Sequence, residues 1–266
     1  MPILRLLRRL SLLALLRALL DAAARALSPP VCAACDAEAA EPAALCSACA
    51  PSVASLPTPT PTPAPASAPC SLHPPPIVAF AAYRGALAVA LRRFKYRARP
   101  DLARPLGRLL AQAARRAALG ADLVIPVPLH PRRLAERGYN QAALLAAEVA
   151  AALGAPLCAR GLERLRDTTQ QARLDRGARL GNVAEAFRAR WPARVRGRAV
   201  VLVDDVATTG ATLTACGEAL LRAGATSVVC LVVARAGADD DDDAANAPDS
   251  TDSPQSGPQL RGFPQR

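Results

Sequence analysis

The stretch that decides the fold is Val200-Val-Leu-Val-Asp-Asp-Val-Ala-Thr-Thr-Gly-Ala-Thr212. Its apolar residues predict a buried strand that ends at two adjacent carboxylates, Asp204 and Asp205. A short loop of Ala, Thr and Gly follows, and a helix is expected to begin near Leu213. Ligands of open parallel sheets bind outside the carboxyl ends of the strands. The stretch therefore predicts a binding site as well as a strand.

The loop after the strand has the chemistry of an anion site. Small side chains, hydroxyls and free backbone N–H groups at a helix N-terminus suit a phosphate, and Gly210 permits close backbone approach. Two carboxylates beside a phosphate would repel it unless they face a sugar diol or a hydrated Mg²⁺. The predicted ligand is therefore a phosphorylated sugar. No Gly-Lys-[Ser/Thr] follows the loop, which excludes a P-loop.

Residues 77–236 alternate between predicted strands and predicted helices. This alternation predicts an α/β fold with a parallel sheet covered on both faces. The expected strands are Ile77–Tyr83, Leu123–Val127, Ala199–Val203 and Ser227–Val233, and the expected helices are Ala86–Tyr96, Asp101–Leu119, Asn140–Leu153 and Leu213–Ala223.

Composition excludes several classes of protein. The 266 residues include 33 basic and 22 acidic side chains, for a net charge of +11, and Lys95 is the only lysine. Arg, Ala and Pro in these amounts resemble genome base composition, so the charge is weak evidence for a nucleic-acid partner. No apolar run approaches the roughly 18 residues of a spanning helix, which excludes a multi-pass membrane protein. The composition also excludes a collagen-like or wholly disordered chain.

Four of the eight cysteines are arranged as Cys32-x2-Cys35-x10-Cys46-x2-Cys49. This spacing suits tetrahedral Zn²⁺, without which so small a segment could hardly fold. Reduced thiols predict a cytoplasmic location. The apolar surroundings of the later cysteines predict buried core thiols, at Cys158, Cys216 and Cys230.

Three further segments flank the sheet domain. The pattern of Leu and Arg over residues 1–29 predicts an amphipathic helix, which packs on the rest of the protein or on a partner, or lies on a membrane surface. Residues 30–76 hold the cysteine pairs and then a Pro/Thr-rich linker beginning at Pro57. Residues 237–266 contain an unbroken acidic run, Asp239 to Asp243, and predict a disordered acidic tail.

The stretch 200–212 resembles the phosphoribosyl-pyrophosphate (PRPP) motif of type I phosphoribosyltransferases. The resemblance implies a parallel sheet of that type and Mg²⁺–PRPP as the ligand. It implies that Asp204 and Asp205 bind the ribose hydroxyls. It also implies that the 5′-phosphate is held by Ala207, Thr208, Thr209, Gly210, Ala211 and Thr212.

A narrower resemblance, over residues 30–236, is to the ComF family of double zinc ribbon, phosphoribosyltransferase-like proteins. Its marks are the Cys pairs, Phe94-Lys95-Tyr96, Pro126-Val-Pro128, Arg137-Gly-Tyr-Asn-Gln141, Thr168-x2-Gln171-x2-Leu174, Arg179-x2-Asn182 and Phe187, with the PRPP motif. The resemblance implies that Lys95 lies near the ligand. The sequence lacks ligands for a second ribbon, because only Cys70-x2-His73 remains; whether that pair binds metal stays open.

The segment Pro126–Arg133 follows a predicted strand at the same sheet edge as the phosphate loop. Its backbone N–H groups, with Arg132 and Arg133, are candidates to bind pyrophosphate, and a solvated face is the alternative. His130 is a catalytic or a structural histidine. Thr168–Asn182 is a candidate loop that closes over the ligand, or an ordinary exposed connection.

Two functions of different class follow. In the first, the protein is a transferase that binds Mg²⁺–PRPP and passes the phosphoribosyl group to an acceptor that the sequence does not identify. In the second, it is a binding protein; the ComF resemblance implies handling of single-stranded DNA in natural transformation, with phosphate contacts that depend steeply on salt.

Overall fold

The computed structural model describes residues 30–40, 43–54, 56, 74–165 and 186–237. At its centre is a four-stranded parallel sheet with the strand order β1-β6-β5-β2. The strands are β1 (Ile77–Ala82), β2 (Leu123–Pro126), β5 (Ala199–Ala207) and β6 (Ser227–Arg235). Their carboxyl ends share one edge, since Ala207 pairs with Arg235 and Pro126 with Val203.

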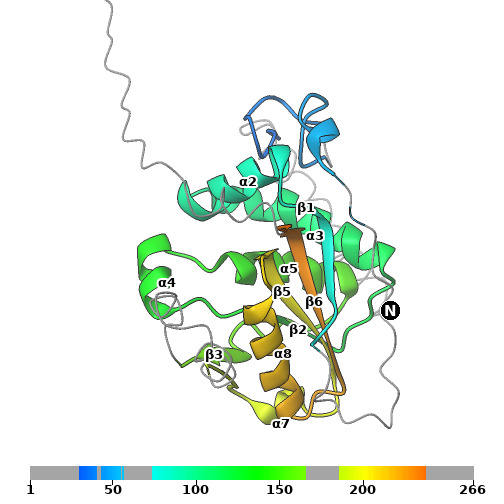
Figure 1. Ribbon diagram of the computed structural model, residues 1–266, viewed down its shortest axis with the longest axis vertical. Helices are drawn as coiled ribbons and strands as arrows, with labels where there is room; N and C mark the ends of the chain where they lie inside the picture. Colours follow the sequence, from blue (N-terminus) through cyan, green and yellow to red (C-terminus); the bar gives the residue numbers. More distant parts are fainter. Residues whose placement is uncertain (1–29, 41–42, 55, 57–73, 166–185, 238–266) are drawn as a thin grey trace, which may run out of the picture.

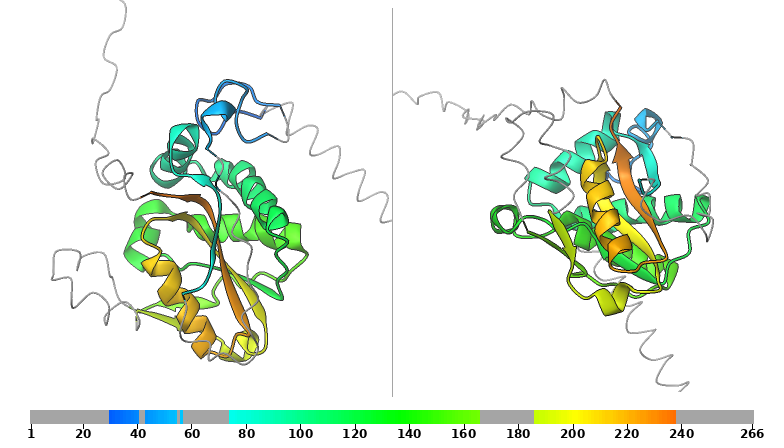
Figure 2. Two further views of the ribbon diagram at one scale, coloured as in Figure 1. Left: turned by 45° about the vertical axis from the view of Figure 1, so that its right-hand side comes forward. Right: turned by 60° about the horizontal axis from the view of Figure 1, so that its bottom comes forward.

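Helices cover both faces of the sheet (Figures 1 and 2). Side chains alternate along β5, so Val201 and Val203 pack in one buried cluster while Val200 and Leu202 pack in the other. The first cluster is built with α2 (Gly85–Tyr96), α3 (Ala103–Arg116) and α5 (Gln141–Leu153). The second is built mainly with α8 (Ala211–Arg222), short α7 (Pro192–Val195) and the antiparallel pair β3 (Leu162–Arg164) and β4 (Phe187–Ala189). The predicted α/β architecture is therefore confirmed.

The predicted end of the site-bearing strand is wrong. β5 continues beyond Val203 to Ala207, so the acidic pair lies inside the strand rather than after it. The cause is the neighbouring strand: β6 runs to Arg235, and its backbone continues the ladder with Asp204, Val206 and Ala207. The length of a strand here is set by its partner and not by its own apolar run.

Two other boundaries differ from the prediction and bear on the site. α8 begins at Ala211, which places Ala211 and Thr212 in its first turn and leaves Thr208–Gly210 as the loop. The segment after β2 contains a helix, α4 (Pro131–Arg137), so Arg132 and Arg133 are helical residues rather than loop residues. A 3-10 turn (η2, Pro100–Leu102) precedes α3, which starts at Ala103 rather than at Asp101.

The four-cysteine segment packs beside α2 (blue and cyan in Figures 1 and 2). Ala33 is fully buried in the core cluster that includes α2, and Leu45 and Val53 pack against that cluster. A 3-10 turn, η1 (Ala50–Ser52), leads out of the second cysteine pair. The segment therefore lies against the sheet domain, and the division into domains at residues 30–76 and 77–236 stays a prediction.

Several predictions concern residues outside the described ranges. They are the helix over 1–29, the linker from Pro57, the Cys70–His73 pair, the loop over Thr168–Asn182 and the tail beyond Gly237. Among the described helices, none is both long and apolar enough to cross a membrane.

Candidate functional site

The two acidic residues of β5 point to opposite faces of the sheet. Adjacent strand residues alternate, and the neighbours of each carboxyl agree with this. Asp205 is 6% exposed and lies on the α2 side, with Lys95 Nζ 3.0 Å from its Oδ1. Asp204 is partly exposed, lies electrostatically near Arg164 of β3, and its Oδ1 accepts the backbone N–H of Asp205 at 2.9 Å. Strand β2 pairs with β5 only as far as Val203, so a ligand held by both carboxyls must lie at the edge that β5 leaves unpaired beyond that residue.

Lys95 supplies the positive charge that this acidic pair requires. It lies on the last turn of α2, and its side chain is 22% exposed. Burial lowers the pKa of Lys95. The charge of Asp205, the hydrogen bond to Asp205 and the charge of Asp204 together raise it by more, so the pKa of Lys95 lies above the ordinary lysine value. The ammonium therefore stays protonated at neutral pH and compensates Asp205.

The Asp204 carboxyl has a strongly shifted pKa. Burial, followed by the negative charge of Asp205, raises the pKa of Asp204 to about 7. Lys95 and Arg164 lower it only partly. A carboxyl that titrates near neutral pH beside a second carboxylate binds a cation or hydroxyl groups readily, because either one relieves the repulsion.

The loop after β5 leads directly into the N-terminus of α8. Thr208 and Thr209 are exposed, whereas Ala207 is buried, with its carbonyl accepting the N–H of Ala236 at 2.9 Å. Gly210 is the N-cap residue of α8 with φ +78°, a conformation that favours glycine, and it has no side chain to cap the helix. The Thr209 hydroxyl oxygen accepts the N–H of Ala211 at 3.4 Å. The other N–H groups of the first turn, which includes Thr212, suit an anion.

The loop after β2 approaches the same sheet edge. The Val127 N–H donates to the carbonyl of Val203 at 2.9 Å, and Asn140 Nδ2 donates to the Val127 carbonyl at 3.0 Å. His130 is the N-cap of α4, and its Nδ1 accepts the N–H of Arg132 at 3.3 Å. This contact supports the structural interpretation of His130.

The two arginines of α4 have different surroundings. Arg132 is exposed and forms an ion pair with Glu136 at 3.2 Å. Arg133 instead lines a pocket of about 410 Å³, together with Lys95, Tyr96, Ala98, Glu136, Arg137 and Tyr139. This cavity, here the α2–α4 pocket, begins at the lysine that pairs with Asp205. It contains three cationic side chains and one carboxylate, so it favours an anion.

The α2–α4 pocket joins two sequence motifs, in which only Lys95 was expected to lie near the ligand. Phe94-Lys95-Tyr96 ends α2, and Arg137-Gly-Tyr-Asn-Gln141 lies between α4 and α5. The Tyr139 hydroxyl donates to the Phe94 carbonyl, and the two rings have centroids 5.8 Å apart. The Arg137 guanidinium lies 5.1 Å from the centroid of the Tyr96 ring, which is 64% exposed. Sequence reasoning missed Tyr96, Arg137 and Tyr139 as pocket residues, although both motifs were visible.

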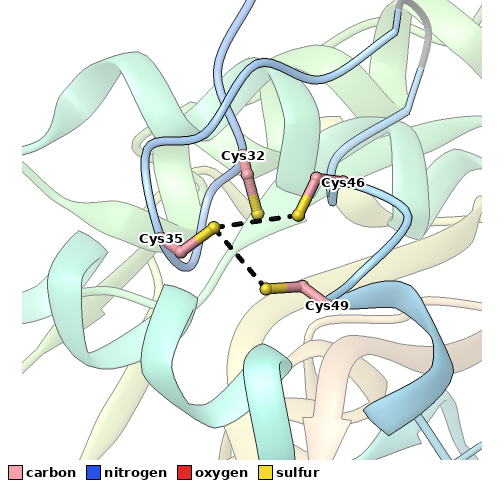
Figure 3. A group of neighbouring side chains, drawn as sticks. All are labelled: Cys32, Cys35, Cys46 and Cys49. Carbon is pink, nitrogen blue, oxygen red and sulfur yellow. Dashed lines mark hydrogen bonds between the residues drawn. The ribbon is translucent and has the colours of Figure 1, made fainter.

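The four cysteines converge as their spacing predicts (Figure 3). All four sulfur atoms lie within 4.8 Å of one another, and Cys35 Sγ is 3.7 Å from the sulfurs of both Cys46 and Cys49. Tetrahedral zinc with Zn–S bonds of about 2.3 Å needs S···S separations of about 3.8 Å. Cys32, Cys35, Cys46 and Cys49 therefore fit a zinc ion. The remaining described cysteines are buried in the core, as predicted: Cys158, Cys216 and Cys230.

Comparison with known proteins agrees with this architecture. The family model described as "Phosphoribosyl transferase domain" matches residues 139–256. DNA utilization protein YhgH of Salmonella typhi is 36% identical over 167 residues, which are 60% of this chain and 73% of the relative. Competence protein F of Haemophilus influenzae is 34% identical over 170 residues, 60% of this chain and 72% of the relative. The chain belongs to the ComF family.

Solved structures resemble the chain over part of its length. Glutamine PRPP amidotransferase from B. subtilis is 27% identical, with a TM-score of 0.38, over 53% of this chain and 30% of that protein. Membership of the ComF family rests on the sequence relatives, and the family's phosphoribosyltransferase-like sheet is the one described above.

Proposed function

We propose that this ComF family protein binds Mg²⁺–PRPP at the carboxyl end of β5 and transfers its phosphoribosyl group to an acceptor. The observation that carries the proposal is the juxtaposition of three features at one sheet edge. They are the acidic pair, the N-terminus of α8 with its glycine N-cap and a basic pocket that begins at Lys95. A sugar with a phosphate at one end and a pyrophosphate at the other requires this combination.

The residues divide the ligand between them in a definite order. Thr208, Thr209 and the first N–H groups of α8 receive the 5′-phosphate, where the helix dipole favours negative charge. Asp204 and Asp205 accept hydrogen bonds from the ribose hydroxyls. Arg133 and the loop after β2 face the pyrophosphate.

In the transfer, a lone pair of the acceptor forms a bond to C1 of the ribose. The bond from C1 to the pyrophosphate oxygen breaks, and the electron pair leaves with pyrophosphate. The acceptor then loses its proton to water. Lys95, Arg133 and Arg137 stabilise the negative charge that develops on the leaving group.

Magnesium fits the donor set, because Asp204 and Asp205 offer the oxygen ligands that it prefers. When bound, Mg²⁺ neutralises part of the pyrophosphate charge. The raised pKa of Asp204 reflects burial and, after it, repulsion from Asp205 that a bound cation would reduce. Zinc at the four cysteines would be structural, and its thiolate ligands fit a reducing, cytoplasmic location.

The proposal is tested by calorimetric titration of the full chain with PRPP, with and without Mg²⁺. We expect saturable, Mg²⁺-dependent binding that is lost in the double variant Asp204→Asn with Asp205→Asn. Glu218→Gln, on the exposed side of α8, is the matched control and should bind like the parent. Unchanged affinity in the double variant would refute the site.

Binding of single-stranded DNA is the second candidate. An exposed Tyr96 ring beside the Arg137 guanidinium provides a surface on which a base could stack, and the pocket cations would contact phosphates. The names of the relatives, which refer to DNA utilization and competence, agree with this function. It predicts that Tyr96→Ala weakens binding of an oligothymidylate and that affinity falls steeply with salt. A flat salt dependence would contradict it.

A further inference from the structure

The four-cysteine segment contacts α2 at both ends of the helix. At the N-terminus, Ser52 Oγ accepts the N–H of Ala86 at 2.9 Å and so caps α2 from another part of the chain. The same hydroxyl donates to the Cys49 carbonyl at 2.8 Å. The approach requires glycine at position 85, because a Cβ there would lie 2.6 Å from the Ser52 carbonyl oxygen.

At the C-terminal end, a single carboxylate holds two arginines. Asp36 forms ion pairs with Arg93 of α2 and, at 3.0 Å, with Arg99 beyond the helix. Arg93 also donates to the carbonyl of Ala33 at 3.1 Å. Asp36 directly follows Cys35, and its N–H donates to the Cys32 carbonyl at 3.1 Å, so the turn that carries the first two thiols also fixes this carboxylate.

The backbone at this contact is strained on both sides. Asp36 has φ +61° and Ala98 has φ +48°, and neither residue is glycine. Such conformations persist where the surrounding structure determines them. Ala98 lies next to Arg99 and lines the α2–α4 pocket, whereas Lys95 lies two residues after Arg93. The arginines held by Asp36 therefore flank the residues that form the site.

We propose that Asp36 is a positioning residue that links metal binding at the four cysteines to ligand binding at the acidic pair. With the metal bound, the first cysteine turn holds the Asp36 carboxylate against Arg93 and Arg99. This contact fixes the last turn of α2, and with it Lys95 beside Asp205 and Ala98 in the pocket wall. The proposal rests on the proposed function, because it takes PRPP as the ligand of that site.

Electrostatics alone makes the opposite prediction. Asp36→Asn removes a negative charge near a basic pocket, so a purely coulombic effect would strengthen binding of an anionic ligand. Loss of positioning would weaken it. The Asp36 side chain is 52% exposed, and ion pairs of that kind contribute little to global stability. The variant should therefore remain folded, and the sign of the change in affinity separates the two explanations.

The test uses the full-length, zinc-loaded protein and PRPP with Mg²⁺ as the probe. We expect Asp36→Asn to keep the zinc content of the parent and to bind PRPP about tenfold more weakly. Glu38→Gln makes the same charge change at an exposed position of the same segment, so its affinity should stay within twofold of the parent. Asp101→Asn removes the other carboxylate from Arg99 without breaking the link to the cysteines, and its effect should be the smaller.

Hydrogen exchange provides a readout that does not depend on PRPP. Amides of residues 93–99 should exchange faster in Asp36→Asn, in Arg93→Gln and in the parent after chelation of zinc, while amides of β5 stay protected. If the parent binds no PRPP, the proposed function fails, but exchange still tests the link. Equal or tighter PRPP binding by Asp36→Asn, or exchange that is unchanged over residues 93–99, would overturn the proposal.

Discussion

Replacing Lys95 by Met tests the electrostatic centre of the site. Met keeps most of the apolar stem and removes the ammonium that lies 3.0 Å from Asp205 Oδ1. The side chains are 22% and 9% exposed, so the pair is largely but not fully removed from water. At an effective dielectric constant of about 20, two unit charges at this distance attract by roughly 5 kcal/mol. The net stabilisation is smaller, because both groups lose solvation.

Protonation sets an upper limit on the loss of stability. In Lys95→Met, the acidic pair can take up an additional proton instead of keeping an uncompensated charge. For a carboxyl with an ordinary pKa near 4, this costs about 4 kcal/mol at pH 7, at about 1.4 kcal/mol per pH unit. We therefore expect the variant to lose about 2–4 kcal/mol in free energy of unfolding at pH 7.

The sign of the pH dependence follows from the proton count. The folded variant binds more protons at the acidic pair than the unfolded chain does, so its stability relative to the parent rises as pH falls. Lys95 has a raised pKa, so in the parent it stays protonated throughout this range and contributes no slope of its own. Asp204, with a pKa of about 7, takes up a proton in the parent over the same range, so the variant's excess is less than one proton. The difference between parent and variant should therefore shrink as pH falls from 7.5 to 5.5, by less than the roughly 1.4 kcal/mol per unit that a whole extra proton gives.

Urea unfolding of zinc-loaded parent and variant across pH 5.5–7.5 measures the effect. Lower pH is avoided because protonated thiols release metal. The double variant Lys95→Met with Asp205→Asn removes both charges and should lack the pH-dependent part of the loss. A loss that is the same at every pH would refute the reasoning, since it would assign the role of Lys95 to packing of its stem.

Three further predictions use other parts of the structure. Because the pKa of Asp204 is about 7, a proton competes with Mg²⁺ at this carboxyl below that pH, and Mg²⁺-dependent affinity for PRPP should fall about tenfold from pH 8 to pH 6. Calorimetry at several pH values measures the affinity, and an affinity that does not change with pH contradicts the prediction. Cys35→Ser should abolish the binding of one zinc ion per chain by metal analysis, whereas Cys158→Ser should not. Gly210→Ala should lose about 1–2 kcal/mol in urea unfolding, because φ is +78° and a Cβ would lie 3.1 Å from Ile77 Cδ1.

Local sequence predicts the architecture of the site well and its boundaries poorly. The apolar run before Asp204 and the glycine after Thr209 indicate strand, loop and helix, and the structure has all three in order. The end of the strand depends on how far β6 runs beside it, which is a property of another segment. The same reason explains why the two carboxylates, expected after the strand, lie within it and so point to opposite faces of the sheet.

The α2–α4 pocket could not be derived from spacing. Tyr96 and Tyr139 come from motifs more than 40 residues apart in sequence, and neither motif states which surface it faces. Their meeting depends on the Tyr139 hydroxyl reaching the carbonyl of Phe94, the last residue of α2 that is fully buried. The packing of Tyr139 against the buried Phe94 therefore brings Tyr139 to the same pocket as the exposed Tyr96 ring.

The net charge of +11 does not show which arginines are available to a ligand. Arg93 and Arg99 are held by Asp36, whereas Arg133 and Arg137 line the pocket, and all four are the same residue type. Their acidic partners make the distinction, so the distribution of the 22 acidic residues is more informative than the count of basic ones. It follows that substituting a carboxylate such as Asp36 distinguishes positioning from direct contact with the ligand, which substituting a single arginine does not. A lost arginine weakens anion binding whatever its role. A carboxylate outside the acidic pair, such as Asp36, weakens anion binding when it is lost only where that carboxylate holds the site in place.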